Sequence, residues 1–237
     1  FWPPVEKWGD GARRTLYLAV LEEMDRQLGV LFDRVQNDPE LRNNTLILAC
    51  SDKGPDPGAG DAGPFRGLKT NLYEGGIRSS LVAWGPGVLS AQKKVDKDSL
   101  FSAIDLVPTL LHLTGTEASP DTTFDGETIP GIFAESGQSR KAPLFFRRPP
   151  DRNTFHTGED LPDLAMRTAE WKLLCEFDGS GVQLYNISED LGENHNLAEK
   201  RPEVVKELLP QLLSWQESMP QDNGATYKDP RRNKKKK

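Results

Sequence analysis

A helix-period segment followed by a short, unbroken apolar run constrains the fold of this chain more than any other feature. Between residues 15 and 35 apolar side chains recur every three or four positions, as on one face of a helix (Leu16, Val20, Met24, Leu28, Leu31 and Val35). Pro39 ends that helix, because the residue before a proline is pushed out of the helical region. The run from Thr45 to Cys50 then predicts a strand covered on both faces.

Strand and helix signals continue to alternate up to residue 115. Residues 80–84 predict a second buried strand. Residues 105–113 predict a helix that ends at Gly115, with Asp105 accepting the free N–H groups of its first turn. This alternation predicts an α/β layer with a largely parallel sheet.

The second part of the chain carries strand signals at short spacing. Three segments predict a small antiparallel sheet (144–146, 165–177 and 182–187) and an amphipathic segment over residues 202–219 predicts a closing helix. We therefore expect an α/β part over residues 1–137, a small antiparallel subdomain over residues 138–225, and a basic disordered tail over residues 226–237.

Charge is divided unevenly along the chain. The net charge is −6, but residues 228–237 hold seven basic side chains against Asp229, which leaves −12 on residues 1–227. The strongly negative charge of residues 1–227 argues against nucleic acid as a partner. No apolar run approaches the roughly 20 residues of a membrane-spanning helix. Cys50 and Cys175 set no disulfide framework, and Cys50, inside an apolar run, is expected to be buried.

The turn Ser51-Asp52-Lys53-Gly54 is the sharpest candidate for a functional site. It follows a predicted buried strand, and open α/β sheets place their ligands at such strand ends. Asp52 is therefore a site candidate on position alone. The alternative is that Asp52 caps a turn, a common role for Asp.

A second group of candidates follows a loop rich in Gly, Pro and Asp over residues 54–68. Lys69 suits an anionic oxygen as a compact point charge. The pair Gly75-Gly76 permits backbone conformations that are closed to other residues. Glu74 and Arg78, four positions apart, predict a structural ion pair.

In this order the motifs resemble the second half of the sulfatase family, of the arylsulfatase and N-acetylgalactosamine-6-sulfatase type, within the alkaline phosphatase superfamily. The resemblance rests on Ser51-Asp52-x-Gly54, Arg66-Gly-x-Lys69 and Tyr73-Glu-Gly-Gly-Ile-Arg78, and continues in register from about Tyr17 to Met219. It implies an alkaline-phosphatase-like mixed α/β sheet flanked by helices, with a small antiparallel C-terminal subdomain and a helix. It also implies an exported protein (periplasmic, extracellular or lysosomal).

The resemblance further implies that the parent protein hydrolyses a sulfated small molecule or carbohydrate. Family members use a formylglycine, made in a Cys/Ser-x-Pro-x-Arg motif, beside a divalent cation, usually calcium. Carried over by position, Asp52 is a metal ligand and Lys69 is the catalytic lysine that contacts the sulfate. Judged from its place in the loop, Arg66 is either a substrate contact or a solvated loop charge. The chain contains no such nucleophile motif, so we expect this chain alone to be inactive.

Position 53 departs from the family pattern. Calcium-type sulfatases have an Asn metal ligand there and zinc-type phosphatases have a His, but a protonated Lys53 has no lone pair to give a metal. Three outcomes follow: Lys53 swings away, its amine replaces part of the cation's charge, or the site has decayed. The alternatives to a sulfatase are a non-catalytic anion-binding protein and a phosphoryl or phosphonate hydrolase, the latter disfavoured because no His follows Asp52.

Overall fold

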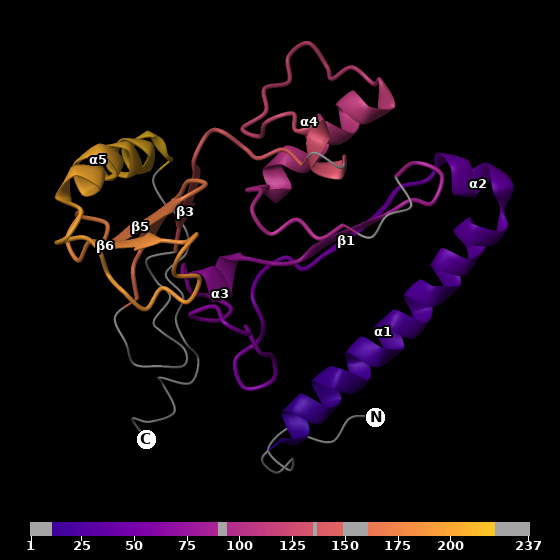
Figure 1. Cartoon of the computed structure of the whole chain (residues 1–237), viewed down its shortest axis with the longest axis horizontal. Coiled ribbons are helices and arrows are strands. Elements are labelled where there is room, and N and C mark those ends of the chain that lie inside the picture. The colour runs from indigo at the N-terminus through magenta and orange to yellow at the C-terminus, as the bar shows by residue number, and fades with distance from the viewer. Residues whose placement is uncertain (1–10, 90–93, 135–136, 149–160, 221–237) are drawn as a thin grey trace, which may run out of the picture.

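Two separate antiparallel sheets organise the chain. The computed structural model describes residues 11–89, 94–134, 137–148 and 161–220, so the predicted basic tail lies outside the described residues. In this part of the chain β1 pairs with β2, and β3, β4, β5 and β6 form a four-stranded sheet in that order (Figure 1). The short helix α3 lies between the two sheets and, as shown below, next to the candidate site.

The long helix predicted at the N-terminal end is confirmed as α1 (Ala12–Asn37). The predicted stop before Pro39 is also confirmed: Asp38 is extended, and its side chain accepts the N–H groups of Glu40 and Leu41 to begin α2 (Pro39–Asn44). Among the side chains of α1 only Val35 is buried. In Figure 1 the helix runs as a diagonal rod along one side of the molecule.

The predicted parallel pairing and double-sided burial of the first two strands are wrong. β1 (Ile47–Cys50) and β2 (Leu81–Trp84) are antiparallel, with Cys50 opposite Leu81. The connection between them contains only the single-turn helix α3 (Glu74–Ile77), which returns the chain alongside β1 instead of carrying it across a sheet. No residue of either strand is buried, and Cys50 is exposed, so its predicted burial is also wrong.

The helix predicted from residue 105 begins two residues earlier, as α4 (Ala103–Thr114). Ser102 is the N-cap and Asp105 occupies the third helical position, where the two form a capping box. Asp105 thus accepts the N–H of Ser102, not those of the first helical turn. Gly115 ends the helix with φ 62°, as predicted.

A buried ion pair fastens the next segment to α4. Asp105 pairs with Arg140, and both side chains are almost fully buried. Asp105 also accepts the N–H of Glu127 at 2.7 Å, and Thr109 accepts the N–H of Ile129 at 2.9 Å. These bonds hold the short 3₁₀ helix η2 (Pro130–Phe133) beside α4.

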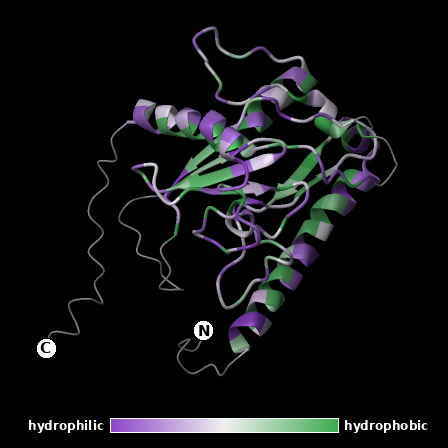
Figure 2. Cartoon of the chain, turned by 60° about the vertical axis from the view of Figure 1, so that its left-hand side comes forward, coloured by the Kyte–Doolittle hydropathy of each residue, from purple (hydrophilic) through white to green (hydrophobic). Residues whose placement is uncertain are grey.

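The four-stranded sheet carries the main hydrophobic core. The expected strand over residues 165–177 is two strands, because the chain turns back at residues 168–170. The strands are β3 (Leu144–Arg147), β4 (Leu164–Arg167), β5 (Trp171–Cys175) and β6 (Gln183–Asn186). The predicted last helix is α5 (Pro202–Ser218), which packs on one face of this sheet (Figure 2).

Each face of the sheet is covered by a different part of the chain. Toward α5, Leu212 belongs to a buried cluster with side chains of β4, β5 and β6, and Trp215 stacks on Phe145 with ring centroids 5.2 Å apart. On the opposite face, Leu72 and Tyr73 of the segment before α3 pack among residues of the same three strands. The sheet therefore supports the segment that contains the candidate site. No helix among the described residues has the length and apolarity to cross a bilayer.

Candidate functional site

Asp52 and Lys53 form an exposed ion pair just after β1. Lys53 Nζ lies 3.1 Å from Asp52 Oδ2, and 78% of the Asp52 side chain is exposed. The hydrogen bond from Lys53 and the attraction of the Lys53 and Lys69 ammonium groups lower the pKa of Asp52 below its ordinary value. Asp52 is therefore ionised at neutral pH, and Lys53 already occupies one of its oxygens.

Gly54 holds this turn directly against α3. Its N–H donates to the Gly76 carbonyl at 2.9 Å, and a Cβ on Gly54 would lie 1.8 Å from the Gly75 carbonyl oxygen. A Cβ on Gly75 would in turn lie 2.2 Å from the carbonyl oxygen of Gly67. Neither Gly75 nor Gly76 has a positive φ, so the predicted need for unusual backbone conformations is wrong at this pair. Glycine is required there because backbones approach too closely for any side chain.

Lys69 lies on a loop that is hydrogen-bonded to the same turn. Its N–H donates to the Pro55 carbonyl at 3.0 Å, and its ammonium lies 3.9 Å from Asp56 Oδ2. The next residue, Thr70, has φ 83°, a left-handed conformation that is rare for a β-branched residue. Such conformations persist only where the surroundings over-determine the backbone, as at functional sites. The fold thus brings Lys69 to the Asp52 turn, close enough to lower the pKa of that carboxyl.

The first turn of α1 supports the outer side of this loop. Arg13 NH2 lies 3.3 Å from Asp56 Oδ1, the same carboxylate that faces Lys69. Arg14 NH1 donates to the Ala59 carbonyl at 2.6 Å. These contacts tie the Gly- and Pro-rich loop to a long helix that lies next to it.

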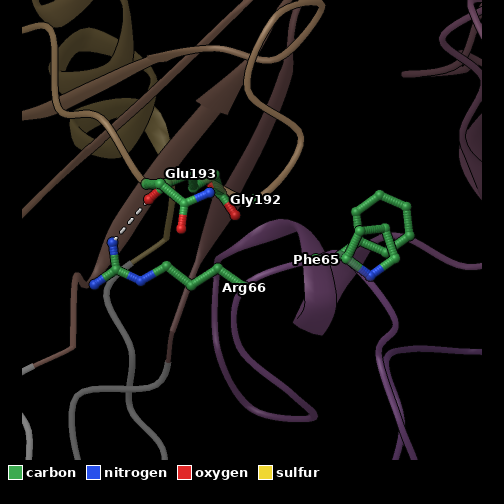
Figure 3. A pocket seen from close by; sticks show the side chains of 6 residues that line it. Phe65, Arg66, Gly192 and Glu193 are labelled. Atoms are coloured by element: carbon green, nitrogen blue, oxygen red, sulfur yellow. Dashed lines mark hydrogen bonds between the residues drawn. The ribbon is translucent and has the colours of Figure 1, made fainter.

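Arg66 contacts the C-terminal sheet. Its NH1 donates to the Tyr185 hydroxyl at 3.0 Å and to the Glu193 carbonyl at 3.2 Å, and its guanidinium carbon lies 3.9 Å from the centroid of the Tyr73 ring. Figure 3 shows the side chain extending from its loop toward Glu193 across an open pocket of about 540 Å³. These contacts give Arg66 a structural role, and its contact with substrate stays a prediction.

Comparisons with known proteins match this arrangement of motifs. The sulfatase family model matches residues 4–116. A sulfatase of Formosa agariphila is 29% identical over 203 residues, which cover 78% of this chain and 36% of that protein. Arylsulfatase A of Homo sapiens is 30% identical over 226 residues, which cover 83% of this chain and 42% of that protein. The chain belongs to the sulfatase family. It spans about two fifths of the length of these curated relatives.

Solved structures share the fold of this sulfatase-family chain. The crystal structure of Ps i-CgsB superposes with a TM-score of 0.75 at 24% identity, over 98% of this chain and 49% of the other. Its complex with k-i-k-neocarrahexaose gives 0.70 at 25% identity, over 94% and 46%. BT4656, in complex with its substrate D-glucosamine-2-N,6-O-disulfate, gives 0.59 at 22% identity, over 88% and 42%. The predicted alkaline-phosphatase-like α/β fold with its C-terminal subdomain is confirmed.

The described residues of this sulfatase-family chain do not fit a divalent cation by themselves. No group of three or more His, Cys, Asp or Glu side chains among them is placed to hold a metal ion. Asp52 offers the carboxylate oxygens that calcium prefers. However, the Lys53 ammonium has no lone pair and contacts the same carboxylate.

A buried polar cluster lies beside the site, and the sequence predicted only one of its ion pairs. The predicted Glu74–Arg78 pair is confirmed at 3.4 Å, but Glu74 also contacts Arg167 of β4 and Lys172 of β5. One signal could have pointed to this cluster. Lys172 interrupts the apolar run Trp171 to Cys175, and a lysine within a buried strand needs a partner of opposite charge.

Proposed function

We propose that the protein hydrolyses sulfuric esters and that this chain supplies two charges to its anion site, the carboxylate of Asp52 and the ammonium of Lys69. The observation that carries the proposal is the convergence of these two residues on one glycine-packed turn in a sulfatase-family chain. A backbone fixed so tightly keeps the charges in place before a substrate arrives. Such preorganised charge is an effective way to stabilise a transition state.

Lys69 is proposed to bind the sulfate group. An ester sulfate carries negative charge that increases on the leaving oxygen as the bond breaks, and a fixed ammonium nearby lowers the energy of that state. Lys69 Nζ is held loosely, 3.9 Å from Asp56 and partly exposed, so it is free to turn toward an anion. Arg66 is proposed as a second, weaker contact at the edge of the same loop.

A calcium ion and a formylglycine are part of the same proposal. Calcium, when bound, would supply positive charge beside the sulfate, and Asp52 would be one of its oxygen ligands. Lys53 opposes this role, because its ammonium and a cation compete for the same carboxylate. The nucleophile would come from residues that this chain does not contain.

The proposed substrate is a sulfated carbohydrate or a sulfated small molecule. Support comes from the structural neighbours that were solved in complex with k-i-k-neocarrahexaose or D-glucosamine-2-N,6-O-disulfate. The open pocket lined by the Arg66 loop and the turn at Glu193 offers polar groups beside the proposed anion site.

A non-catalytic anion-binding protein is the second candidate. The 3.1 Å contact between Lys53 and Asp52 favours it, since a lysine ammonium already neutralises the only carboxylate proposed for the metal in this chain. Such a protein would keep the anion contact of Lys69 and lose turnover.

The deciding experiment compares turnover of an aryl sulfate with that of the matching aryl phosphate, using the complete protein with its nucleophile matured. We expect faster sulfate turnover and, in Lys69→Ala, a loss of about 10²-fold or more in kcat/KM. Lys206→Ala, an exposed lysine on α5, serves as the matched control and should change nothing. Faster phosphate turnover would favour a phosphoryl hydrolase.

Lys53→Asn separates the two candidates. If neither ester is turned over by the unchanged protein and activity appears only in Lys53→Asn, the anion-binding function is the better account. Calorimetric titration with calcium gives a second readout. We expect Lys53→Asn to bind calcium about tenfold more tightly, because an ammonium is replaced by a neutral oxygen donor.

A further inference from the structure

Four buried charges lie where the loop of Lys69 meets the C-terminal sheet. Glu74 begins α3, Arg167 ends β4, Lys172 lies in β5, and Glu193 lies in the turn after β6. Lys172 and Glu193 are fully buried, and Glu74 and Arg167 are 3% and 8% exposed. Charged side chains are almost never buried to this extent unless they are paired.

Lys172 joins the two carboxylates. Its Nζ lies 3.0 Å from Glu74 Oε1 and 3.0 Å from Glu193 Oε1. The other carboxylate oxygen of Glu193 accepts the backbone N–H of Glu74 at 2.7 Å. Arg167 Nε adds a contact of 3.5 Å to Glu74 Oε1. The cluster therefore fixes both the side chain and the backbone of Glu74.

The same cluster fixes the other end of the Lys69 loop. The Gly75 N–H donates to the Arg66 carbonyl at 2.7 Å, which closes the loop at its base. Arg66 donates to the Glu193 carbonyl (Figure 3). Because Glu193 also accepts the Glu74 N–H, it contacts both sides of that base. Lys69 lies between these two anchored points, next to the strained Thr70.

We infer that Lys172 and Glu193 are positioning residues for Lys69: they hold the base of its loop on the C-terminal sheet and so set the place of the anion-binding ammonium without touching the anion. This inference rests on the proposed role of Lys69. The cluster is buried and sets two cations against two carboxylates, so removing Lys172 takes away the ammonium that lies between Glu74 and Glu193 at the base of the loop. The loop then loses the geometry that holds Lys69.

The test measures binding of inorganic sulfate to the complete protein by calorimetry. We expect Lys172→Met to weaken sulfate binding about tenfold and Glu193→Gln about threefold, in the range of coupled buried contacts. Lys172→Arg, which keeps the charge, should recover part of the affinity. Lys206→Met, on the exposed side of α5, is the control and should bind as the unchanged protein does.

A double-mutant cycle tests the route of the effect. If Lys172 acts through Lys69, Lys172→Met has no further effect on sulfate binding in a Lys69→Ala background. Additive losses would overturn the inference. So would a Lys172→Met protein that melts at a lower temperature yet binds sulfate with unchanged affinity, because that is the behaviour of a merely structural residue.

Hydrogen exchange separates this inference from the proposed function. In Lys172→Met and Glu193→Gln the Gly75 amide should exchange at least about tenfold faster than in Lys206→Met, whether or not sulfate binds. If the complete protein hydrolyses no sulfate but the amide still loses protection, the tie between sheet and loop stands and the proposed function fails. Unchanged protection in both variants overturns the inference. Glu193→Gln keeps the size of the side chain and removes the charge that pairs with Lys172, so it decides the matter if Lys172→Met does not fold.

Discussion

The first and last parts of the described chain are held together in very different ways. α1, β1 and β2 contribute a single buried residue, Val35, although α1 alone has 26 residues. In β4, β5 and β6 nearly every residue is buried, and α5 closes one face with Leu208 and Leu212. Figure 2 shows the apolar strands at the centre and apolar and polar turns mixed along α1.

The difference teaches where the candidate site obtains its rigidity. Asp52 follows β1, a strand with no buried residue, whereas the base of the Lys69 loop rests on the buried sheet. The two halves of the site therefore have unequal support. Packing density, not the regularity of a strand or helix, decides which half is firm.

The largest expected effect contrasts a core residue of α5 with an exposed residue of α1. Leu212→Ala removes a fully buried side chain and should lower the free energy of unfolding by about 2–5 kcal/mol. Met24→Ala, at a position that is 51% exposed, should change it by less than about 0.5 kcal/mol. Urea unfolding followed by circular dichroism measures both. Equal losses would break the comparison.

Two glycines give a contrast of opposite sign. Gly54→Ala forces a Cβ against the Gly75 carbonyl and should destabilise the protein by about 1–3 kcal/mol while weakening sulfate binding. Gly29→Ala, in α1 with open space around its Cα, should stabilise it by about 0.5–1 kcal/mol. Thermal unfolding and sulfate calorimetry on the same samples check both signs. A harmless Gly54→Ala would mean that the turn and α3 are not in contact in solution.

The buried cluster should show two opposed titrations. Burial pushes the pKa of Glu74 up, but Lys172 and Arg167 outweigh it and hold that pKa below 4.5; its stabilising effect is present above pH 4.5 and is lost as the pH falls through the folded value. Burial raises the pKa of Glu193 above 4.5 against the pull of Lys172, so its contribution is present at low pH and is lost as the pH rises through the folded value.

Carboxyl-carbon NMR between pH 2 and 8 measures these steps, which belong to a coupled pair. Glu193→Gln serves as the control, because it should remove the upper step and keep the lower one. Two midpoints at the ordinary glutamate value would show that water reaches the cluster and that the firm half of the site is no firmer than the other.

The two thiols give the smallest and simplest contrast. Cys50, exposed at the end of β1, should react with a thiol reagent at pH 8 in the folded chain, whereas Cys175 should react only after unfolding. Burial raises the pKa of Cys175 to about 12, so little thiolate is present. Cys50→Ser should abolish the fast reaction. Fast reaction of both thiols would contradict the burial of β5.

Local sequence patterns predicted the elements well, because helix and strand periods are short-range signals. The positions of α1, β1, β2, α4 and α5 follow from apolar spacing, from Pro39 and from Gly115. The pairing of β1 with β2 could not be predicted in this way, because direction depends on the path of a connection that contains one turn of helix. The turn at residues 168–170 could not be predicted from local signals either, because no Gly or Pro marks it.

The candidate site was predictable where it is local and hidden where it is not. Asp52, Lys53 and Lys69 lie within a short stretch of the chain, and their motifs are visible in order. Glu74 meets Lys172 across 98 residues and Glu193 across 119, and no local pattern encodes such a distance. Only the isolated lysine in an apolar strand hinted at a partner.

The hydrogen bond from the Glu74 N–H to the Glu193 carboxylate also determines when, during synthesis of the chain, the Lys69 loop can reach its final structure. A ribosome makes Asp52 and Lys69 first, and the residue that secures their loop, Glu193, is added more than one hundred residues later. During that interval the nascent chain carries a glycine-rich segment without its final support, and contacts of such long range are slow to form. Anion-binding competence is therefore gained late in synthesis, and a premature stop codon between residues 70 and 172 would leave Asp52, Arg66 and Lys69 in the product without Lys172 and Glu193.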